Sequence, residues 1–195
     1  MAIAQSKKII EHREIILKDR PQTLYDISSK GTVPVLYIDE NNIIDESFDI
    51  MIWAIKNSNC NWLAINKKEQ LEIINNIDED FKFWLDRYKY FDRHPQHSQN
   101  FYKNKCIKYL EQYNILLGDS LYLFDNSIQM VDVALFPFVR QFAHVNLEWF
   151  ERTLNNLNLW LDRIKKSDLF LSIMLKYDIW DQKGEGTFTD YLSNR

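Results

Sequence analysis

The residues best suited to chemistry in this 195-residue chain are Glu46 and Ser47. They precede an apolar run from Phe48 to Ile55, so they mark the start of a helix. Backbone N–H groups at a helix N-terminus, together with a serine hydroxyl, attract a carboxylate, and a glutamate accepts hydrogen bonds from an ammonium group. The pair therefore suits a ligand that carries both groups at one end, although it also suits a plain helix cap.

The histidines and cysteines are weaker candidates. The segment His94-Pro-Gln-His97 has the spacing of two metal ligands, but the proline and the lack of neighbouring thiolates or carboxylates favour a polar connection between helices. We expect no metal site. Cys60 and Cys106 lie far apart in the sequence, without a Cys-x-x-Cys pair, so we expect no disulfide.

Composition excludes several classes of protein. The net charge is −4 and the basic residues are scattered, which argues against nucleic-acid binding. No apolar run approaches the roughly 18 residues of a membrane span, and the first residues lack the apolar stretch of a signal peptide. We therefore expect a cytoplasmic protein with neither nucleic acid nor membrane as a partner.

The first part of the chain has mixed α/β character. β-Branched residues predict a strand at 11–17, and the segments 33–38 and 43–44 flank four polar residues as in a β-hairpin. Short helices are expected over 2–8 and 24–27, and a longer one from Glu46. The turn-forming residues 57–61 then indicate a linker.

The rest of the chain is predicted to be helical. Apolar residues recur every three or four positions in 81–91, and we expect further helices around 99–117, 130–144, 153–166 and 168–178. The tail segment Gly184-Glu-Gly-Thr187 is expected to be loose. These patterns predict a small α/β domain over residues 1–57 and an all-helical domain over residues 66–180.

Three segments together resemble the bacterial omega-like glutathione S-transferases. They are Lys30-Gly-Thr-Val-Pro-Val-Leu36, Ile44-Asp-Glu-Ser-Phe-Asp-Ile-Met-Ile-Trp53 and Gln129-Met-Val-Asp-Val-Ala-Leu-Phe-Pro-Phe-Val-Arg-Gln-Phe142. In the third, Asp132 matches the capping box of the family's sixth helix, but Gln129 replaces the usual Ser or Thr cap, which should weaken the helix start by about 1 kcal/mol. The resemblance implies a thioredoxin-like domain followed by a helical glutathione-transferase domain.

The resemblance also implies a glutathione site. Pro34 would follow a cis peptide bond, and Val33 would pair its main chain with the cysteinyl part of glutathione. Glu46 and Ser47 would hold the γ-glutamyl end. Arg20 matches the residue that meets the glycyl carboxylate, although a solvated loop arginine is an equally good interpretation. The family is generally homodimeric, so a homodimer is implied as well.

The family's first strand and its Cys or Ser turn have no counterpart, because Met1-Ala2-Ile3 matches the interior of the family's first helix. Neither Cys60 nor Cys106 can replace that nucleophile, so we assign no catalytic residue. We expect an N-terminally truncated form that does not conjugate glutathione to an electrophile or reduce a mixed disulfide, with the natural start upstream. The alternatives are a non-catalytic interaction protein that keeps the fold and the product of a broken gene.

Overall fold

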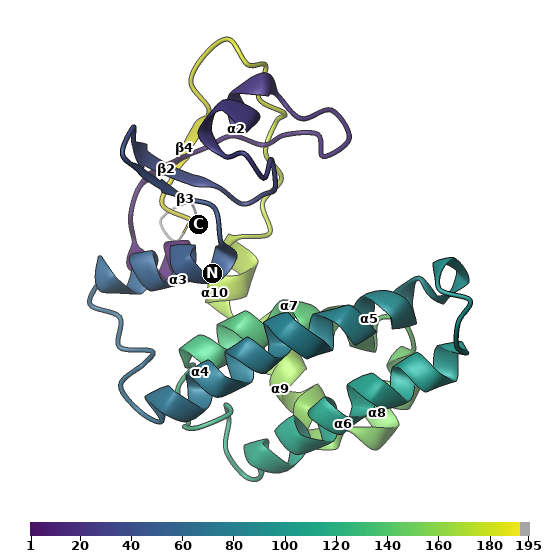
Figure 1. Ribbon diagram of the computed structural model, residues 1–195. Helices are drawn as coiled ribbons and strands as arrows, with labels where there is room; N and C mark the ends of the chain where they lie inside the picture. The colour runs from purple at the N-terminus through teal and green to yellow at the C-terminus, as the bar shows by residue number, and fades with distance from the viewer. Residues whose placement is uncertain (192–195) are drawn as a thin grey trace. The chain divides into compact units, whose positions relative to one another are not determined.

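The computed structural model describes residues 1–191, and these residues form two compact units (Figure 1). The first unit contains residues 1–60 together with the described residues from Ser167 onward. The second unit contains residues 61–166. The predicted boundaries of 1–57 and 66–180 differ from this division mainly in the segment that follows Ser167. As boundaries of family domains they stay a prediction.

The first unit combines short helices with two small sheets. Its elements are α1 (Ala2–Ser6), β1 (Ile10–His12), α2 (Gln22–Ile27), β2 (Leu36–Asp39), β3 (Asn42–Ile44), α3 (Ser47–Lys56), α10 (Asp168–Ser172) and β4 (Thr187–Thr189). Strands β2 and β3 pair antiparallel, with Leu36 opposite Ile44. Helix α1 packs against α3 and α10, and its buried residues Ala2 and Ala4 are small enough to allow a close approach.

The polar turn of the predicted hairpin closes around one carboxylate. Asp39 accepts hydrogen bonds from the backbone N–H of Asn41 at 2.9 Å and from the side-chain amide of Asn42 at 2.8 Å. Such a side-chain turn favours reversal of the chain without a glycine. The hairpin ends directly before α3, so it fixes where that helix begins.

Three expectations for this unit were wrong. The strand expected over 11–17 is limited to Ile10–His12, and the helix expected over 168–178 ends at Ser172. The segment 184–187 is not loose, because Gly186 donates to Glu11 and β4 pairs antiparallel with β1, with His12 opposite Thr187. The tail is held by contacts with residues more than 160 positions away, and no local pattern reveals such contacts.

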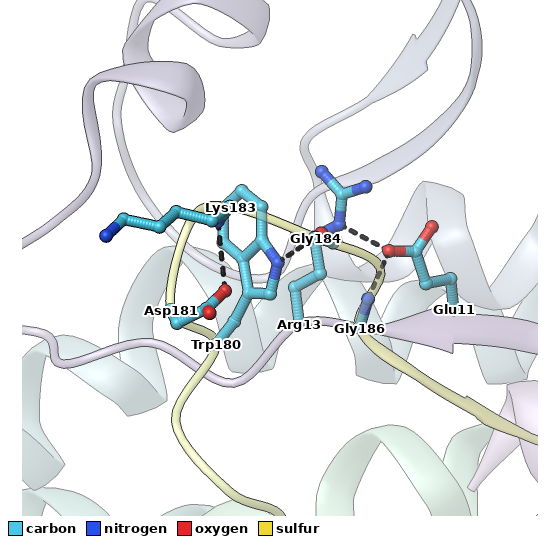
Figure 2. Close-up of polar contacts among 7 residues, drawn as sticks. All are labelled: Glu11, Arg13, Trp180, Asp181, Lys183, Gly184 and Gly186. Atoms are coloured by element: carbon cyan, nitrogen blue, oxygen red, sulfur yellow. Dashed lines mark hydrogen bonds and ion pairs between the residues drawn. The ribbon is translucent and has the colours of Figure 1, made fainter.

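Figure 2 shows how side chains support this pairing. One carboxylate oxygen of Glu11 accepts from Arg13 Nε at 2.7 Å and from the backbone N–H of Gly186 at 2.6 Å. The guanidinium of Arg13 lies 4.4 Å from the centre of the Trp180 ring. The indole N–H of Trp180 donates to the carbonyl of Gly184 at 2.7 Å. We call residues 177–191 the C-terminal strap.

The second unit is helical. Its elements are α4 (Lys67–Asn76), the π-helix η1 (Ile77–Phe81), α5 (Lys82–Lys89), the 3₁₀ helix η2 (Phe91–Arg93), α6 (Gln99–Leu117), α7 (Met130–Ala143), α8 (Leu147–Thr153) and α9 (Asn155–Lys165). Helix α5 packs against α6 and α7, α4 against α7, and α9 against α6 and α7. Buried aromatic side chains fill the core between them, among them Phe81, Tyr102, Phe142, Phe150 and Trp160. This is the helical domain that the sequence predicts.

Helix α7 begins after the cap residue Gln129, with Asp132 as its third residue. The Asp132 carboxylate accepts from the backbone N–H of Gln129 at 2.8 Å, as the motif predicts. The side-chain oxygen of Gln129 is buried and has no hydrogen-bond partner within residues 1–191. The expected weakening of the helix start by about 1 kcal/mol, from Gln129 in place of Ser or Thr, stays a prediction.

Candidate functional site

Glu46 and Ser47 lie at the start of α3, as predicted. Glu46 occupies the cap position in extended conformation, and Ser47 is the first helical residue. Both side chains are exposed, and the Ser47 hydroxyl makes no hydrogen bond within the described chain. The N–H groups of the first helical turn have no acceptor inside the helix. A small anion can therefore approach this end of α3.

A lysine that the sequence analysis did not single out joins this helix start to the preceding loop. Lys30 Nζ lies 2.5 Å from a carboxylate oxygen of Glu46 and 3.2 Å from one of Asp45. The hydroxyl of Ser28 donates to the second carboxylate oxygen of Asp45 at 2.9 Å. The turn before the hairpin is thus tied to the N-terminus of α3 by a chain of charged and polar contacts.

These contacts favour the charged forms of the groups involved. The pKa of Lys30 is raised by hydrogen bonds to Glu46 and then to Asp45. The pKa of the Asp45 carboxyl is lowered by the Ser28 hydroxyl and then by Lys30. The contribution of Asp45 to stability is present above the ordinary pKa of an aspartate and is lost as the pH falls below it. The contribution of Lys30 is lost as the pH rises through its raised pKa. Lys30 and Asp45 are therefore both charged throughout the physiological pH range.

Gly31 turns the chain between Lys30 and the Val33-Pro34 segment. Its φ of 58° is in the left-handed region that favours glycine. A Cβ atom here would also clash with the ring of Tyr25. The backbone N–H of Gly31 donates to the carbonyl of Ser28 at 2.9 Å, which closes the turn.

The Val33–Pro34 peptide bond is cis, as predicted. Val33 precedes β2 and lies outside both sheets, and 45% of its surface is exposed. No hydrogen bond of its main chain is found within residues 1–191. Its N–H and C=O groups therefore have the pairing capacity that an extended ligand needs.

Arg20 is the site residue that the structure does not connect to the others. It is exposed and directly precedes Pro21, the buried N-cap residue of α2. Within the described chain no hydrogen bond or ion pair links it to Val33, Glu46 or Ser47. Its assignment to a glycyl carboxylate stays a prediction.

Cys60, Cys106, His94 and His97 do not form a second site. Cys106 is fully buried in α6, and burial raises the pKa of its thiol to about 12. Cys60 is half-buried after α3, and its N–H donates to the Ser58 hydroxyl at 3.2 Å. His94 lies 3.4 Å from the Asp86 carboxylate, whereas His97 stacks on Phe101. Residues 1–191 contain no group of three potential metal ligands and no helix long and apolar enough to cross a membrane.

Comparison with known proteins relates part of the chain to the glutathione S-transferases. Residues 2–62 match the family model described as glutathione S-transferase, N-terminal domain. No curated protein matches the sequence significantly.

Solved structures with the same fold include several glutathione S-transferases. A ternary complex of BphK, a bacterial transferase, is 17% identical, with 88% of each chain covered and a TM-score of 0.71. A class Gtt2 transferase of Vibrio parahaemolyticus is 16% identical, with 87% of this chain and 89% of that one covered and a TM-score of 0.66. Glutathione S-transferase 1-6 from Anopheles dirus species B is 16% identical, with 84% and 81% covered and a TM-score of 0.65. The chain thus has the glutathione S-transferase fold, a thioredoxin-like domain followed by a helical domain.

Proposed function

We propose that this chain is a glutathione S-transferase-like protein of the omega-like group that binds glutathione between the start of α3 and the Val33-Pro34 segment. The proposal is supported by one observation above all. The Lys30 ammonium group contacts Asp45 and Glu46 and so fixes the start of α3 against the turn that leads to Val33. Two groups that recognise different parts of a peptide are therefore held in one exposed region of the first unit.

Each part of glutathione has a matching group in this arrangement. The γ-glutamyl carboxylate accepts from the Ser47 hydroxyl and the first-turn N–H groups of α3, where the helix dipole also favours an anion. The γ-glutamyl ammonium donates to Glu46, which then shares its carboxylate with Lys30. The main chain of Val33 pairs with the cysteinyl residue, and Arg20 meets the glycyl carboxylate.

We further propose that these 195 residues do not catalyse glutathione conjugation or thiol transfer. The resembling family uses a Cys or Ser nucleophile on a turn before its first helix, and Cys60 and Cys106 lie elsewhere in the chain. The Cys106 thiol is buried and has a pKa raised to about 12, so it cannot supply a thiolate at neutral pH. The second substrate of an active relative would be an electrophile or a disulfide. We also propose a homodimeric, cytoplasmic protein, in line with the family.

A second candidate function is a non-catalytic interaction protein that keeps the fold. The Lys30–Glu46 ion pair favours it, because the carboxylate proposed to receive the ligand's ammonium already has a partner. The two candidates differ in a simple respect. Only the first requires glutathione to bind at the start of α3.

We expect Glu46→Gln and Ser47→Ala each to weaken glutathione binding about tenfold, because each removes a hydrogen bond to a charged group of the ligand. Both side chains are exposed, so thermal stability should change little. Isothermal titration calorimetry on the 195-residue chain measures the affinities. Glu40→Gln removes an exposed carboxylate in the β2–β3 turn and serves as the matched control. Unchanged affinity in both site variants would mean that Glu46 and Ser47 form only a helix cap.

A further inference from the structure

A cavity of about 280 Å³ lies in the first unit, apart from the residues proposed to bind glutathione. Apolar side chains form one side of it, from α1 and from the segment after α10: Ile3, Ala4, Ile173 and Leu175. The volume is near the lower end of the range for small-ligand pockets. The cavity therefore suits a compact ligand with an apolar body.

The polar side of the cavity contains a hydrogen-bonded chain centred on His12. Nε2 of His12 lies 3.0 Å from the Glu14 carboxylate, and Nδ1 lies 2.9 Å from the hydroxyl of Tyr191. Because a carboxylate only accepts, Nε2 must carry the hydrogen, and Nδ1 of the neutral ring then accepts from Tyr191. Both ring nitrogens are thus used, and acceptor capacity remains on Glu14 and on the Tyr191 oxygen.

Tyr177 adds a hydroxyl group without a partner. Its ring stacks on His12 with the ring centres 4.3 Å apart, and it lines the same cavity. The hydroxyl oxygen is fully buried and has no hydrogen-bond partner within residues 1–191. Buried polar groups in folded proteins are nearly always paired. The Tyr177 ring therefore helps to line the cavity, but its buried hydroxyl oxygen is out of reach of a ligand there.

The C-terminal strap holds these groups in place. Trp180 lies three residues after Tyr177, and its backbone N–H donates to the Glu14 carbonyl at 2.9 Å. The contacts between Glu11 and Gly186 and between Trp180 and Gly184 close the strap against β1 (Figure 2). The polar side of the cavity is therefore built by two segments far apart in the sequence.

The charges around the cavity favour a cation. Glu14 is the only acidic side chain among the residues that line it, and no lysine or arginine side chain of the described chain lines it. Met1 also lines the cavity, but burial lowers the pKa of its amino group to about 6, so this group is largely uncharged at pH 7. The nearby Arg13 is paired with Glu11 and lies over Trp180.

We propose that this cavity binds a small primary ammonium ligand carried on an apolar body. The ammonium group donates to the Glu14 carboxylate and to the hydroxyl oxygen of Tyr191, and the aromatic rings offer cation–π contacts. The apolar body packs against Ile3 and Leu175. The inference does not depend on glutathione binding, because it uses none of the residues assigned to that ligand.

Benzylamine is a suitable probe, and benzyl alcohol is its neutral counterpart. We expect the 195-residue chain at pH 7 to bind benzylamine at least tenfold more tightly than benzyl alcohol, as measured by NMR titration. The shifted resonances should belong to residues that line the cavity. Equal affinity for the two probes, or no binding of benzylamine at millimolar concentration, would overturn the proposal.

Two substitutions test the polar groups. Glu14→Gln keeps a hydrogen-bonding side chain but removes the charge, and it should weaken benzylamine binding at least tenfold. Tyr191→Phe should weaken it about fivefold, because it removes a hydroxyl that lines the cavity, and Tyr177→Phe should leave it unchanged, because that hydroxyl is buried. If Glu14→Gln does not fold, Tyr191→Phe alone decides. Wild-type affinity in a folded Glu14→Gln variant, or in Tyr191→Phe, would contradict the assignment.

Two glycines of the C-terminal strap, Gly186 and Gly184, provide a test substitution and its control. A Cβ atom on Gly186 would meet the carbonyl of His12 and approach Arg13 Cγ to 2.9 Å, whereas one on Gly184 would meet nothing within 4 Å. Gly186→Ala should therefore displace the strap and weaken benzylamine binding, and Gly184→Ala should leave binding unchanged. Equal binding by these two variants would mean that the strap does not form the site.

Discussion

Replacing Asp132 by alanine should lower the free energy of unfolding by about 4 kcal/mol, because three buried donors would lose their acceptor. The carboxylate accepts from the backbone N–H groups of Leu123 and Gln129 and from the indole N–H of Trp160, at 3.0, 2.8 and 2.7 Å. Each buried donor left unpaired costs about 1–3 kcal/mol. Total stabilities are only about 5–15 kcal/mol, so the second unit would be close to unfolding.

Urea unfolding followed by tryptophan fluorescence measures this loss. Asp162→Ala is the matched control, since Asp162 lies on α9 with 41% of its side chain exposed and pairs with neighbouring lysines. The control should change stability by about 0.5 kcal/mol or less. Similar losses in the two variants would show that the Asp132 network does not anchor α7.

The same carboxyl should make stability depend on pH. Burial raises the pKa of the Asp132 carboxyl to about 6, above the ordinary value for an aspartate. The folded state then holds this proton more tightly than the unfolded state. The contribution of Asp132 to the free energy of unfolding is therefore largest below pH 4 and is lost as the pH rises to 6. Two pKa units correspond to about 3 kcal/mol. Asp132→Asn should keep an acceptor and remove this dependence.

Alkylation of Cys106 should be about 10³-fold slower in the folded protein than in the unfolded chain at pH 8. A thiol with a pKa of about 12 is ionised in about one molecule in 10⁴, whereas an ordinary thiol with a pKa of about 8.5 is ionised in roughly a quarter of molecules. The thiol is also completely buried. Reaction should therefore require unfolding or local opening of α6.

A Cys60→Ser variant leaves Cys106 as the only thiol for this measurement. Iodoacetamide labelling with and without urea, followed by mass spectrometry, gives the two rates. In the folded protein the rate should rise about tenfold per pH unit over the range in which the fold is stable. Rapid labelling of the folded variant at pH 8 would return Cys106 to consideration as a nucleophile.

Local sequence patterns predicted the helices of this fold well. The expected helices at 99–117 and 130–144 agree with α6 and α7, because their apolar residues follow the helical period over several turns. The start of α3 at Ser47 follows from a polar pair placed before an apolar run. Such features depend on residues that are close together in the sequence, so a local pattern reveals them.

Contacts between distant residues could not be predicted in the same way. The pairing of β4 with β1 depends on Glu11 meeting Gly186 and on Arg13 meeting Trp180. Gln70 is a second example, since it donates to the carbonyls of Trp62 and Ile65 and accepts from the N–H of Val131. In sequence it is one polar residue in a polar helix, yet it is fully buried.

The candidate site was predicted in part. Val33, Pro34, Glu46 and Ser47 came from a resemblance to a family, and the cis bond and the helix start agree with it. In the sequence, Lys30 is only the first residue of the segment that runs to Leu36. Its role in joining the Ser28–Gly31 turn to Asp45 and Glu46 appears only when the chain folds.

Titration of the 195-residue chain with glutathione, and separately with the dipeptide cysteinylglycine, tests the central claim most directly. The dipeptide lacks the γ-glutamyl group that the start of α3 is proposed to hold. Calorimetry should show glutathione binding at least tenfold more tightly than the dipeptide. Equal affinities, or no binding of glutathione at millimolar concentration, would contradict the proposed site and favour an interaction protein.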